Sequence, residues 1–462
     1  MNGFLNRKNF FMMIATKKIA ARAIAACATG LFVNISAQAA IPVQHWTQAS
    51  GAQVYLVESP AIAMVDVQLD FDAGSRRDPP GQAGLASLTA NMLEKGVREK
   101  DGAPALDENA LGEAWADLGA NFGAGASADR MSFTLRSLTD PALLDQAVAL
   151  AARQIAEPAY PDAVWQRERQ RLDAALKESY TRPASVVGRA YAKAVYGNHP
   201  YGYEMTEATL ANISVADFQA AHAVGVVACR ARVSLVGAVT RAQADAMAAR
   251  LLSRLPSVPC ASLPALPAVP DVAPLAQAQD ITIPFDSAQA QVLIGQPGFK
   301  RADLDYFPMT VGNYILGGGG FVSRLTNEVR EKRGLTYGIS SSFSPGLHAG
   351  SFTVGLQTRP DQAAQAVQIA RQVVGDFVAS GPSEAELKAA KDNLVGGFAL
   401  RIDSNRKLLA NLAGIAWNDL PLDYLDTWTQ QVEKVSVADI KAAFARKVQP
   451  DKMVTVILGA AK

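Results

Sequence analysis

Residues 132–155 read SFTLRSLTDPALLDQAVALAARQI, and residues 351–374 read SFTVGLQTRPDQAAQAVQIARQVV. In each segment a run of β-branched and apolar residues precedes an alanine-rich stretch, which predicts a strand followed by a helix. The two segments are separated by 351 − 132 = 219 positions. A match of this length indicates an internal repeat, and a repeat constrains the architecture of the whole chain.

A second pair of matching segments follows in the same order. Residues 213–221 read ISVADFQAA, residues 435–443 read VSVADIKAA, and their separation is 435 − 213 = 222 positions. Ser214 and Ser436 each stand where an N-cap begins a helix. The nearly constant separation indicates that the chain is a duplication of a unit of roughly 200 residues.

The stretch between the two copies is crowded with proline: Pro256, Pro259, Pro264, Pro267, Pro270 and Pro274. Proline at this density resists both helix and sheet and favours an extended, semi-rigid connection. We therefore expect one unit over residues 40–255, a proline-rich linker over residues 256–280 and a second unit over residues 281–462.

The fold class follows from the order of the predicted elements. Met64–Asp72 (MVDVQLDFD) alternates between apolar and polar residues, and Gln291–Ile294 (QVLI) is a short apolar run, so both predict strands. Strands and helices come in runs instead of alternating strictly. This order predicts two homologous α+β halves and argues against a doubly wound α/β sheet.

The first forty residues have the layout of a secretory signal peptide. Their only charges are basic, and the apolar run Ala23–Val33 is followed by the cleavage pattern Ala37-Gln38-Ala39. The run is too short to span a bilayer, so a stable membrane anchor is not expected. We expect residues 1–39 to be removed and the mature protein to reside in the periplasm.

Composition excludes one class of partner. Without the five basic residues of the signal segment the charge balance is 39 − 43 = −4, and no basic patch or nucleic-acid motif is evident. Nucleic acid is therefore not an expected partner. Cys229 and Cys260 remain; they could pair in an oxidising compartment, and free buried thiols are an equally good interpretation.

Residues 317–338, GGGGFVSRLTNEVREKRGLTYG, carry the most unusual local pattern. The glycines match neither a P-loop nor a dinucleotide fingerprint, and the plainest expectation is a flexible loop before a helix. Arg330 falls in the last turn of that helix, Gly334 is a natural C-cap, and Leu335, Tyr337 and Ile339 alternate as a strand. Arg330 and Tyr337 could be a dipole partner and an edge aromatic. The same geometry also lets them converge to hold a peptide carbonyl and an oxyanion.

No other hydrolytic machinery is visible. The four histidines, His45, His199, His222 and His348, form no H-x-x-E-H or H-E-x-x-H motif, and no G-x-S-x-G occurs. Cys229 lies seven residues from His222, a pair whose role is more simply structural. By its own residues the chain has no catalytic centre for hydrolysis.

Three segments nevertheless resemble the pitrilysin/insulinase-type zinc metallopeptidases, which include the mitochondrial processing peptidases. They are VDVQLDFDAGSRRDPPGQAGLASLTANML (65–93), NHPYGYEMTEATLANIS (198–214) and SRLTNEVREKRGLTYG (323–338) with its preceding glycines. The resemblance covers nearly the whole mature chain and includes the duplication. Active members carry H-x-x-E-H within residues 84–93, where this chain has Ser87, Ala90 and Asn91. The downstream glutamate ligand is replaced by Ala175, so the resemblance implies that this chain binds no zinc.

In heterodimers of this family one subunit carries the zinc motif, and the other lacks it but keeps the arginine and tyrosine. The resemblance implies that Arg330 holds a substrate carbonyl, that Tyr337 stabilises the oxyanion and that Gly317, Gly318, Gly319 and Gly320 form a loop that touches the peptide. The zinc would be bound by a homologous partner subunit that carries H-x-x-E-H. A sheet edge such as residues 121–127 could hold the peptide by strand addition. The alternative is a catalytically inert peptide-binding or scaffold protein of the same fold.

Overall fold

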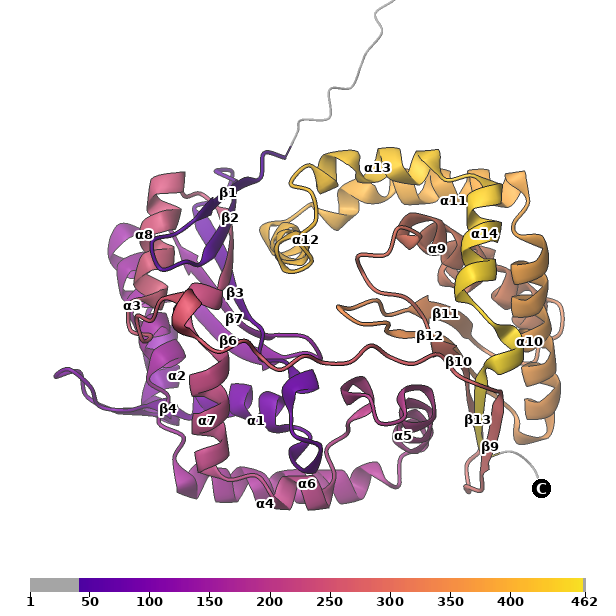
Figure 1. Ribbon diagram of the computed structural model, residues 1–462, viewed down its shortest axis with the longest axis horizontal. Helices are drawn as coiled ribbons and strands as arrows, with labels where there is room; N and C mark the ends of the chain where they lie inside the picture. The colour runs from indigo at the N-terminus through magenta and orange to yellow at the C-terminus, as the bar shows by residue number, and fades with distance from the viewer. Residues whose placement is uncertain (1–40, 460–462) are drawn as a thin grey trace, which may run out of the picture. The chain divides into compact units, whose positions relative to one another are not determined.

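The structure is a computed structural model that describes residues 41–459. The expected signal peptide, residues 1–39, lies outside the described residues. From Ile41 onward the chain forms one compact unit, in which helices cover two large sheets that contain both parallel and antiparallel pairs (Figure 1). The predicted α+β class is confirmed.

The first half contains the elements before the proline-rich linker. Its strands are β1 (Gln44–Thr47), β2 (Gln53–Glu58), β3 (Met64–Phe71), β4 (Gly96–Val97), β5 (Leu106–Asp107), β6 (Asn121–Ala126), β7 (Met131–Leu138) and β8 (Arg232–Gly237). Its helices are α1 (Leu85–Met92), α2 (Glu108–Asp117), α3 (Pro141–Ala156), α4 (Asp162–Ser179), α5 (Pro183–Tyr196), α6 (Glu207–Ala211), α7 (Val215–Gly225) and α8 (Arg241–Leu252).

The second half contains the elements after the linker. Its strands are β9 (Gln279–Ile283), β10 (Ala290–Pro297), β11 (Ile339–Phe343), β12 (Ser351–Thr358) and β13 (Val454–Leu458). Its helices are α9 (Tyr306–Asn313), α10 (Ala363–Ser380), α11 (Glu384–Gly396), α12 (Asn405–Trp417), α13 (Tyr424–Lys434) and α14 (Val437–Lys447). Within residues 41–459 each helix is too short or too polar to cross a lipid bilayer.

The two large sheets repeat one topology, which confirms the duplication. The first has the order β1-β2-β8-β3-β7-β6, and the second has the order β9-β13-β10-β12-β11. Apart from β1, each strand has a counterpart, and the parallel pair β2–β8 corresponds to the parallel pair β9–β13. The matching segments that begin at Ser132 and Ser351 form β7 with α3 and β12 with α10. The predicted strands at Met64 and Gln291 are also present, as β3 and within β10.

The second matching pair forms equivalent helix starts. The Ser214 hydroxyl accepts the Asp217 N–H at the start of α7, and the Asp217 carboxylate accepts the Ser214 N–H in return. Ser436 and Asp439 form the same capping box at the start of α14. Because each box satisfies two helix-end donors with side chains close in sequence, it is readable from a single segment.

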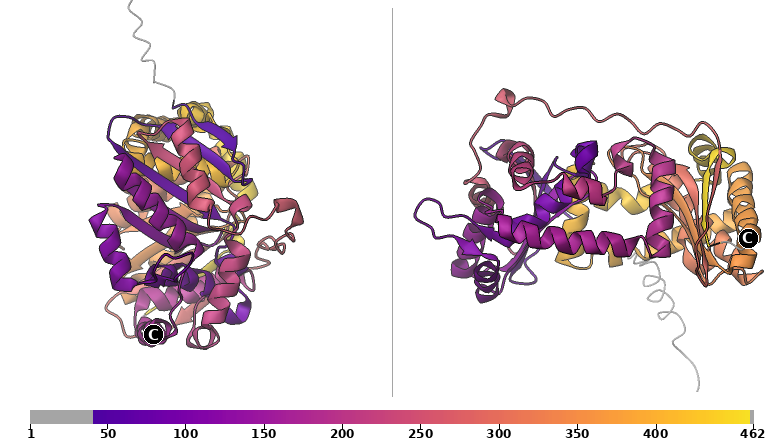
Figure 2. Two further views of the ribbon diagram at one scale, coloured as in Figure 1. Left: turned by 90° about the vertical axis from the view of Figure 1, so that its left-hand side faces the viewer. Right: turned by 90° about the horizontal axis from the view of Figure 1, so that it is seen from below.

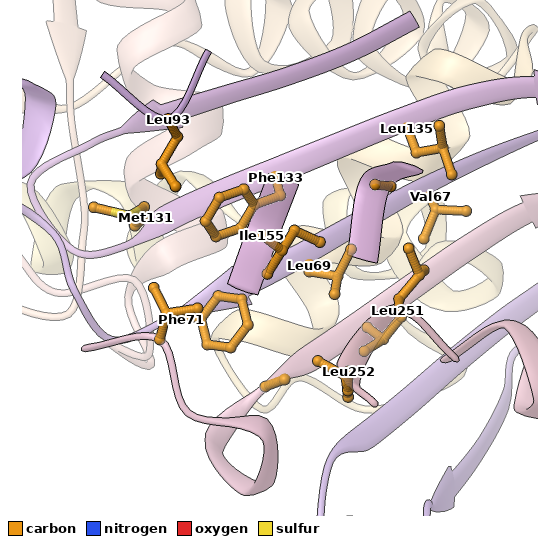
Figure 3. Packing of buried hydrophobic residues seen from close by; sticks show 14 of the residues in the cluster. Val67, Leu69, Phe71, Leu93, Met131, Phe133, Leu135, Ile155, Leu251 and Leu252 are labelled. Atoms are coloured by element: carbon orange, nitrogen blue, oxygen red, sulfur yellow. The ribbon is translucent and has the colours of Figure 1, made fainter. Parts of the chain in front are cut away.

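The core of the first half lies between one face of its sheet and helices α1, α3, α7 and α8. β3 and β7 contribute alternate residues such as Leu69, Phe71 and Phe133, all fully buried, and Ile155 and Leu251 pack against them from the helices (Figure 3). The second half builds a corresponding core from β10, β12 and helices α9–α14. Each sheet therefore buries one face in the core of its own half, and this burial fixes its strand register.

The opposite face of each sheet is covered by a helix from the other half. α5 packs on β10 and β13, where the Tyr191 hydroxyl donates to the Phe352 carbonyl at 2.8 Å. α12 packs on β8 and β3, where Arg130 and Arg232 donate to the Ala413 and Ala416 carbonyls at the end of α12. α5 and α12 follow equivalent strands and helices of the repeat, so the two halves exchange equivalent helices. This exchange explains why the two copies form one compact unit.

The linker runs as an extended segment alongside the molecule (Figure 2). Its proline carbonyls accept hydrogen bonds from the first half: Pro264 from Arg230, Pro267 from Arg77 and Pro270 from His199. Cys229 and Cys260 form a disulfide that ties the start of the linker to the turn preceding β8. β9 begins at Gln279, so the last two residues of the expected linker belong to the second sheet.

Candidate functional site

Helix α1 lies within residues 84–93, where the family resemblance predicts the zinc-binding motif of active members. It begins after Gly84, whose φ of +104° places it in the left-handed region. Asp78 caps it: its carboxylate accepts the Gly84 and Ala86 N–H groups, each at 2.9 Å. Burial raises the pKa of Asp78 to about 6. Leu85 and Leu88 are buried in the first core, so the helix is kept in place by packing and by its cap.

The side chains that α1 presents do not fit a zinc ion. Ser87 is half-buried, Ala90 is buried and Asn91 is exposed, and none offers an imidazole or a carboxylate. Glu94, the next acidic residue, accepts the Ala124 N–H of β6 at 3.0 Å. Within residues 41–459 no group of three or more His, Cys, Asp or Glu side chains is arranged to hold a metal ion.

The position of the downstream ligand gives the same result. Ala175 is an exposed residue of α4, and Glu168 on the same helix has its carboxylate oxygens bonded to Arg167 and Arg171. Ala175 has no ligand atom, and the Glu168 carboxylate is already engaged by two guanidinium groups.

Arg330 lies in a wide π-helical segment, Thr326–Glu331, that ends as the sequence predicts. Gly334 has a φ of +62°, and its N–H donates to the Arg330 carbonyl at 2.8 Å. The Leu335 N–H donates to the Val329 carbonyl, which completes a glycine C-cap. The Arg330 guanidinium carbon lies 4.6 Å from the centre of the Phe321 ring, and about a third of the side chain is exposed to solvent.

Tyr337 is not part of a strand, and the prediction of a strand from Leu335 is wrong. β11 begins at Ile339. The Thr336 hydroxyl donates to the Gln357 carbonyl and accepts the Gly338 N–H, so a side chain replaces the backbone ladder at this point. The Tyr337 ring is 85% exposed. No hydrogen bond joins it to Arg330 within residues 41–459: Arg330 faces Phe321, and Tyr337 borders a hollow on the sheet.

The glycine run is more ordered than a loop. Gly317 and Gly318 continue α9 as a π-helical turn, Tyr314–Gly318, so the expectation of a flexible loop is wrong for these two. Gly317 is buried, and a Cβ there would clash with Ser341 and Leu325. Gly318 and Gly320 are exposed, and Gly320 has a φ of +62°. Close packing and a reversed backbone therefore explain these glycines.

A partly buried ion pair fastens this segment to α11 of the same half. Arg324 donates to both carboxylate oxygens of Glu386, at 2.6 and 2.7 Å, and to the Gly381 carbonyl. The hydrogen bonds from Arg324 lower the pKa of Glu386 to about 2. Phe321 and Val322, at the tip, are 69% and 74% exposed. The tip thus presents apolar side chains on an anchored base.

Tyr337 borders a hollow that the sequence did not reveal. Its volume is about 430 Å³, and it lies on the face of the second sheet that α5 partly covers. Its lining includes Gln291, Gln357, Ser340 and Gly355. The signal was available in the repeat itself, because the match that begins at Ser132 and Ser351 aligns Arg136 with Gly355.

The residues at which the sequence predicts peptide binding form an edge strand, β6. It is the last strand of the first sheet and pairs only with β7. One of its outward N–H groups, that of Ala124, donates to Glu94. The edge is thus available for strand addition on either side of one occupied position.

Comparison with known proteins gives the family. Residues 53–209 match the family described as "Insulinase (Peptidase family M16)". Residues 212–394 match the family described as "Peptidase M16 inactive domain". A crystal structure of a peptidase M16 inactive domain from Pseudomonas fluorescens is 34% identical, with a TM-score of 0.84 over 91% of this chain and 98% of that one. A protease structure from Helicobacter pylori shares the fold, with a TM-score of 0.81 at 18% identity over 91% of this chain and 99% of that one.

Curated relatives support the same family assignment. A "Non-peptidase homolog YmxG" of Helicobacter pylori is 26% identical over 89% of this chain and 92% of its own length. An "Uncharacterized zinc protease YmxG" of Bacillus subtilis is 22% identical over 80% of this chain and 87% of its own length. With the duplicated fold, the α1 helix and the matched segments in place, the chain belongs to the peptidase M16 (pitrilysin/insulinase) family, as an inactive-type member whose α1 lacks the zinc-binding residues.

Proposed function

We propose that this protein is the non-metal subunit of a heterodimeric zinc peptidase in the periplasm, which hydrolyses peptides. The observation that carries the proposal is that this chain lacks the zinc-binding residues of the family but has its arginine and tyrosine. α1 has lost each zinc-binding side chain, whereas Arg330 and Tyr337 are kept and both reach solvent. Both side chains are therefore accessible to a peptide.

The two side chains suit complementary roles on a peptide. The Arg330 guanidinium, resting on Phe321, can donate to a substrate carbonyl while its aromatic contact holds it in place. The Tyr337 hydroxyl can donate to the oxyanion that develops when that peptide bond is attacked. A homologous partner with H-x-x-E-H would bind the zinc, and that zinc would activate the attacking water. Gly318, Gly319 and Gly320 offer backbone close to Phe321 for contact with the same peptide.

An extended peptide has an edge on which to bind. β6 presents unpaired backbone groups along Asn121–Ala126, and its glycines at positions 123 and 125 leave little side-chain bulk in the way. Glu94 occupies the Ala124 N–H, so strand addition there displaces or flanks this contact.

The Cys229–Cys260 disulfide supports the periplasmic location. Disulfides persist in oxidising compartments, and this one closes a loop between two residues that are 31 positions apart. The basic, apolar and A-x-A layout of residues 1–39 points the same way.

A catalytically inert peptide-binding protein is the second candidate. The Helicobacter pylori relative is named a non-peptidase homolog, and the second half matches a domain described as inactive. Under this alternative β6 and the glycine-rich tip still bind peptides, and Arg330 and Tyr337 serve binding alone.

A native pull-down of the tagged chain from the periplasm separates the two candidates. Recovery of an H-x-x-E-H homologue with zinc-dependent cleavage of peptides supports the heterodimeric peptidase. Recovery of the chain alone, without cleavage, supports the inert binding protein.

Two variants then test the assigned roles in the recovered complex. Tyr337→Phe is expected to lower kcat by about 10²–10³-fold, the usual loss for one oxyanion donor, and Arg330→Ala is expected to lower kcat/KM similarly. Arg333→Ala is the matched control, because Arg333 lies in the same turn but pairs with Glu328. Full activity of both Arg330→Ala and Tyr337→Phe would show that the roles are wrong.

A further inference from the structure

Tyr337 borders a hollow whose other lining residues have no part in the proposed function. It has a volume of about 430 Å³, and since a water occupies about 30 Å³ it has room for a side chain with several waters. Its lining includes Val187 of α5 together with Gln289, Gln291, Ser340, Gly355 and Gln357.

The sheet register explains how these residues share one face. Gln291 pairs with Gln357, and Leu293 pairs with Gly355 across β10 and β12. Ser340 of β11 pairs with Gly355. Since side chains two apart on a strand point the same way, these strands contribute their residues to a single surface.

The duplicated half shows why this surface is hollow. The repeat aligns Gly355 with Arg136. Arg136 pairs across the strands with Asp66, and their side chains lie 3.6 Å apart. Leu293 pairs with Gly355 in the same way. In the first sheet, the Arg136–Asp66 pair therefore fills this position. In the second sheet, Gly355 and Leu293 leave the equivalent position open.

The chemistry of the lining is polar without charge. It carries three primary amides and the Ser340 hydroxyl beside the apolar side chains of Leu293 and Val187, and no lining residue is charged. Within residues 41–459 none of the three amide side chains makes a hydrogen bond to another protein group. Amides both donate and accept, whereas a charged group would lose its water here without gaining a counter-ion.

We infer that this hollow receives one side chain of the bound peptide and selects an uncharged polar one: Asn, Gln, Ser or Thr. The inference rests on the proposed function only in that the ligand is a peptide. The inference goes beyond the proposed function by naming the class of peptide side chain that binds next to Tyr337.

Gly355→Val is the variant that closes the hollow. A Cβ at Gly355 would lie 3.5 Å from the Leu293 Cδ2, an ordinary contact, so the added methyl groups extend into the open space. Gln357→Ala removes one amide instead and does not depend on tolerance of a larger residue. Gln372→Ala, an exposed glutamine of α10, is the matched control for loss of an amide.

The assay is competition fluorescence anisotropy with the full mature chain. Blocked alanine-based octapeptides that carry a single Asn, Gln, Ser, Thr, Leu, Asp or Lys at each position compete with one labelled peptide. At one position the uncharged polar peptides are expected to bind about tenfold more tightly than the Asp and Lys peptides, the effect of one or two hydrogen bonds. Gly355→Val and Gln357→Ala should remove that preference, and Gln372→Ala should keep it.

Equal binding of all peptides, no binding of any, or a preference that survives both Gly355→Val and Gln357→Ala would overturn the inference. If circular dichroism shows that Gly355→Val is unfolded, Gln357→Ala decides. Because the assay measures binding without cleavage, its result is separable from the peptidase proposal. A selective chain with no zinc-bearing partner would refute the heterodimer and leave the hollow's role intact.

Discussion

Removal of the disulfide gives a stability prediction with a calculable size. The perturbation is the double variant Cys229→Ser and Cys260→Ser, which frees the start of the linker from the first half. The Cα atoms of the two cysteines are 5.7 Å apart. Linker contacts such as Arg230 to Pro264 remain in the variant, so the folded structure is expected to persist.

The magnitude follows from the chain that the bond closes. With 31 positions between the cysteines, the chain-entropy relation gives a loss of about 12 cal/mol/K, or about 3.7 kcal/mol at 25 °C. For a cooperative unit of roughly 420 residues the entropy of unfolding is about 0.9 kcal/mol/K. The midpoint temperature of thermal unfolding should therefore fall by about 4 °C.

Urea unfolding at equilibrium, followed by circular dichroism, measures the change. The wild type in reducing agent should match the double variant, because both lack the bond. Ser262→Ala, which lies in the same turn as Cys260, is the control and should change the free energy of unfolding by less than about 0.5 kcal/mol. A double variant as stable as the oxidised wild type would refute the reasoning that the bond acts by restricting the unfolded chain.

Two further predictions concern α1 and the glycine run. Because the pKa of Asp78 is about 6 in the folded state and about 3.9 in an unfolded chain, the folded state holds the proton more tightly. The free energy of unfolding should therefore fall by on the order of 2 kcal/mol as the pH rises from about 4 to about 6. Urea titrations of Asp78→Asn across this range should lack that fall, and parallel curves for the two proteins would contradict it. Gly317→Ala places a Cβ against Ser341 and should destabilise the protein by about 1–3 kcal/mol. Gly375→Ala, on the open face of α10, is the control and should stabilise the protein by up to about 1 kcal/mol. Thermal melts in which the two variants change the midpoint temperature equally would refute the packing argument.

The features that the sequence predicted well are local. The strands at Met64 and Gln291, the caps at Ser214 and Ser436 and the glycine end at Gly334 are each set by residues within a few positions, so one segment is enough to recognise them. The duplication was equally visible, because two matching pairs in the same order and at nearly the same separation do not arise readily by chance.

The features that the sequence missed depend on distant residues. The strand expected at Leu335 is displaced because the Thr336 hydroxyl bonds to Gln357, which lies on another strand. The pairing of Cys229 with Cys260 was left open, since spacing alone does not bring two thiols together. Gly317 looks like part of a flexible loop until β11 is seen packed against it. The roles of Arg330 and Tyr337 stay predictions, because they concern contacts with a peptide and not contacts within the chain.

The exchanged helices have a consequence for the order in which the protein can fold. α12, which covers β8 and β3, is synthesised long after both strands, so the first sheet is complete in sequence well before its cover exists. Until then Asp70, fully buried in the finished protein, faces water. We therefore expect that neither half completes its fold alone. The rate-limiting event of folding is expected to be the late, long-range docking of α12 onto the first sheet and of α5 onto the second.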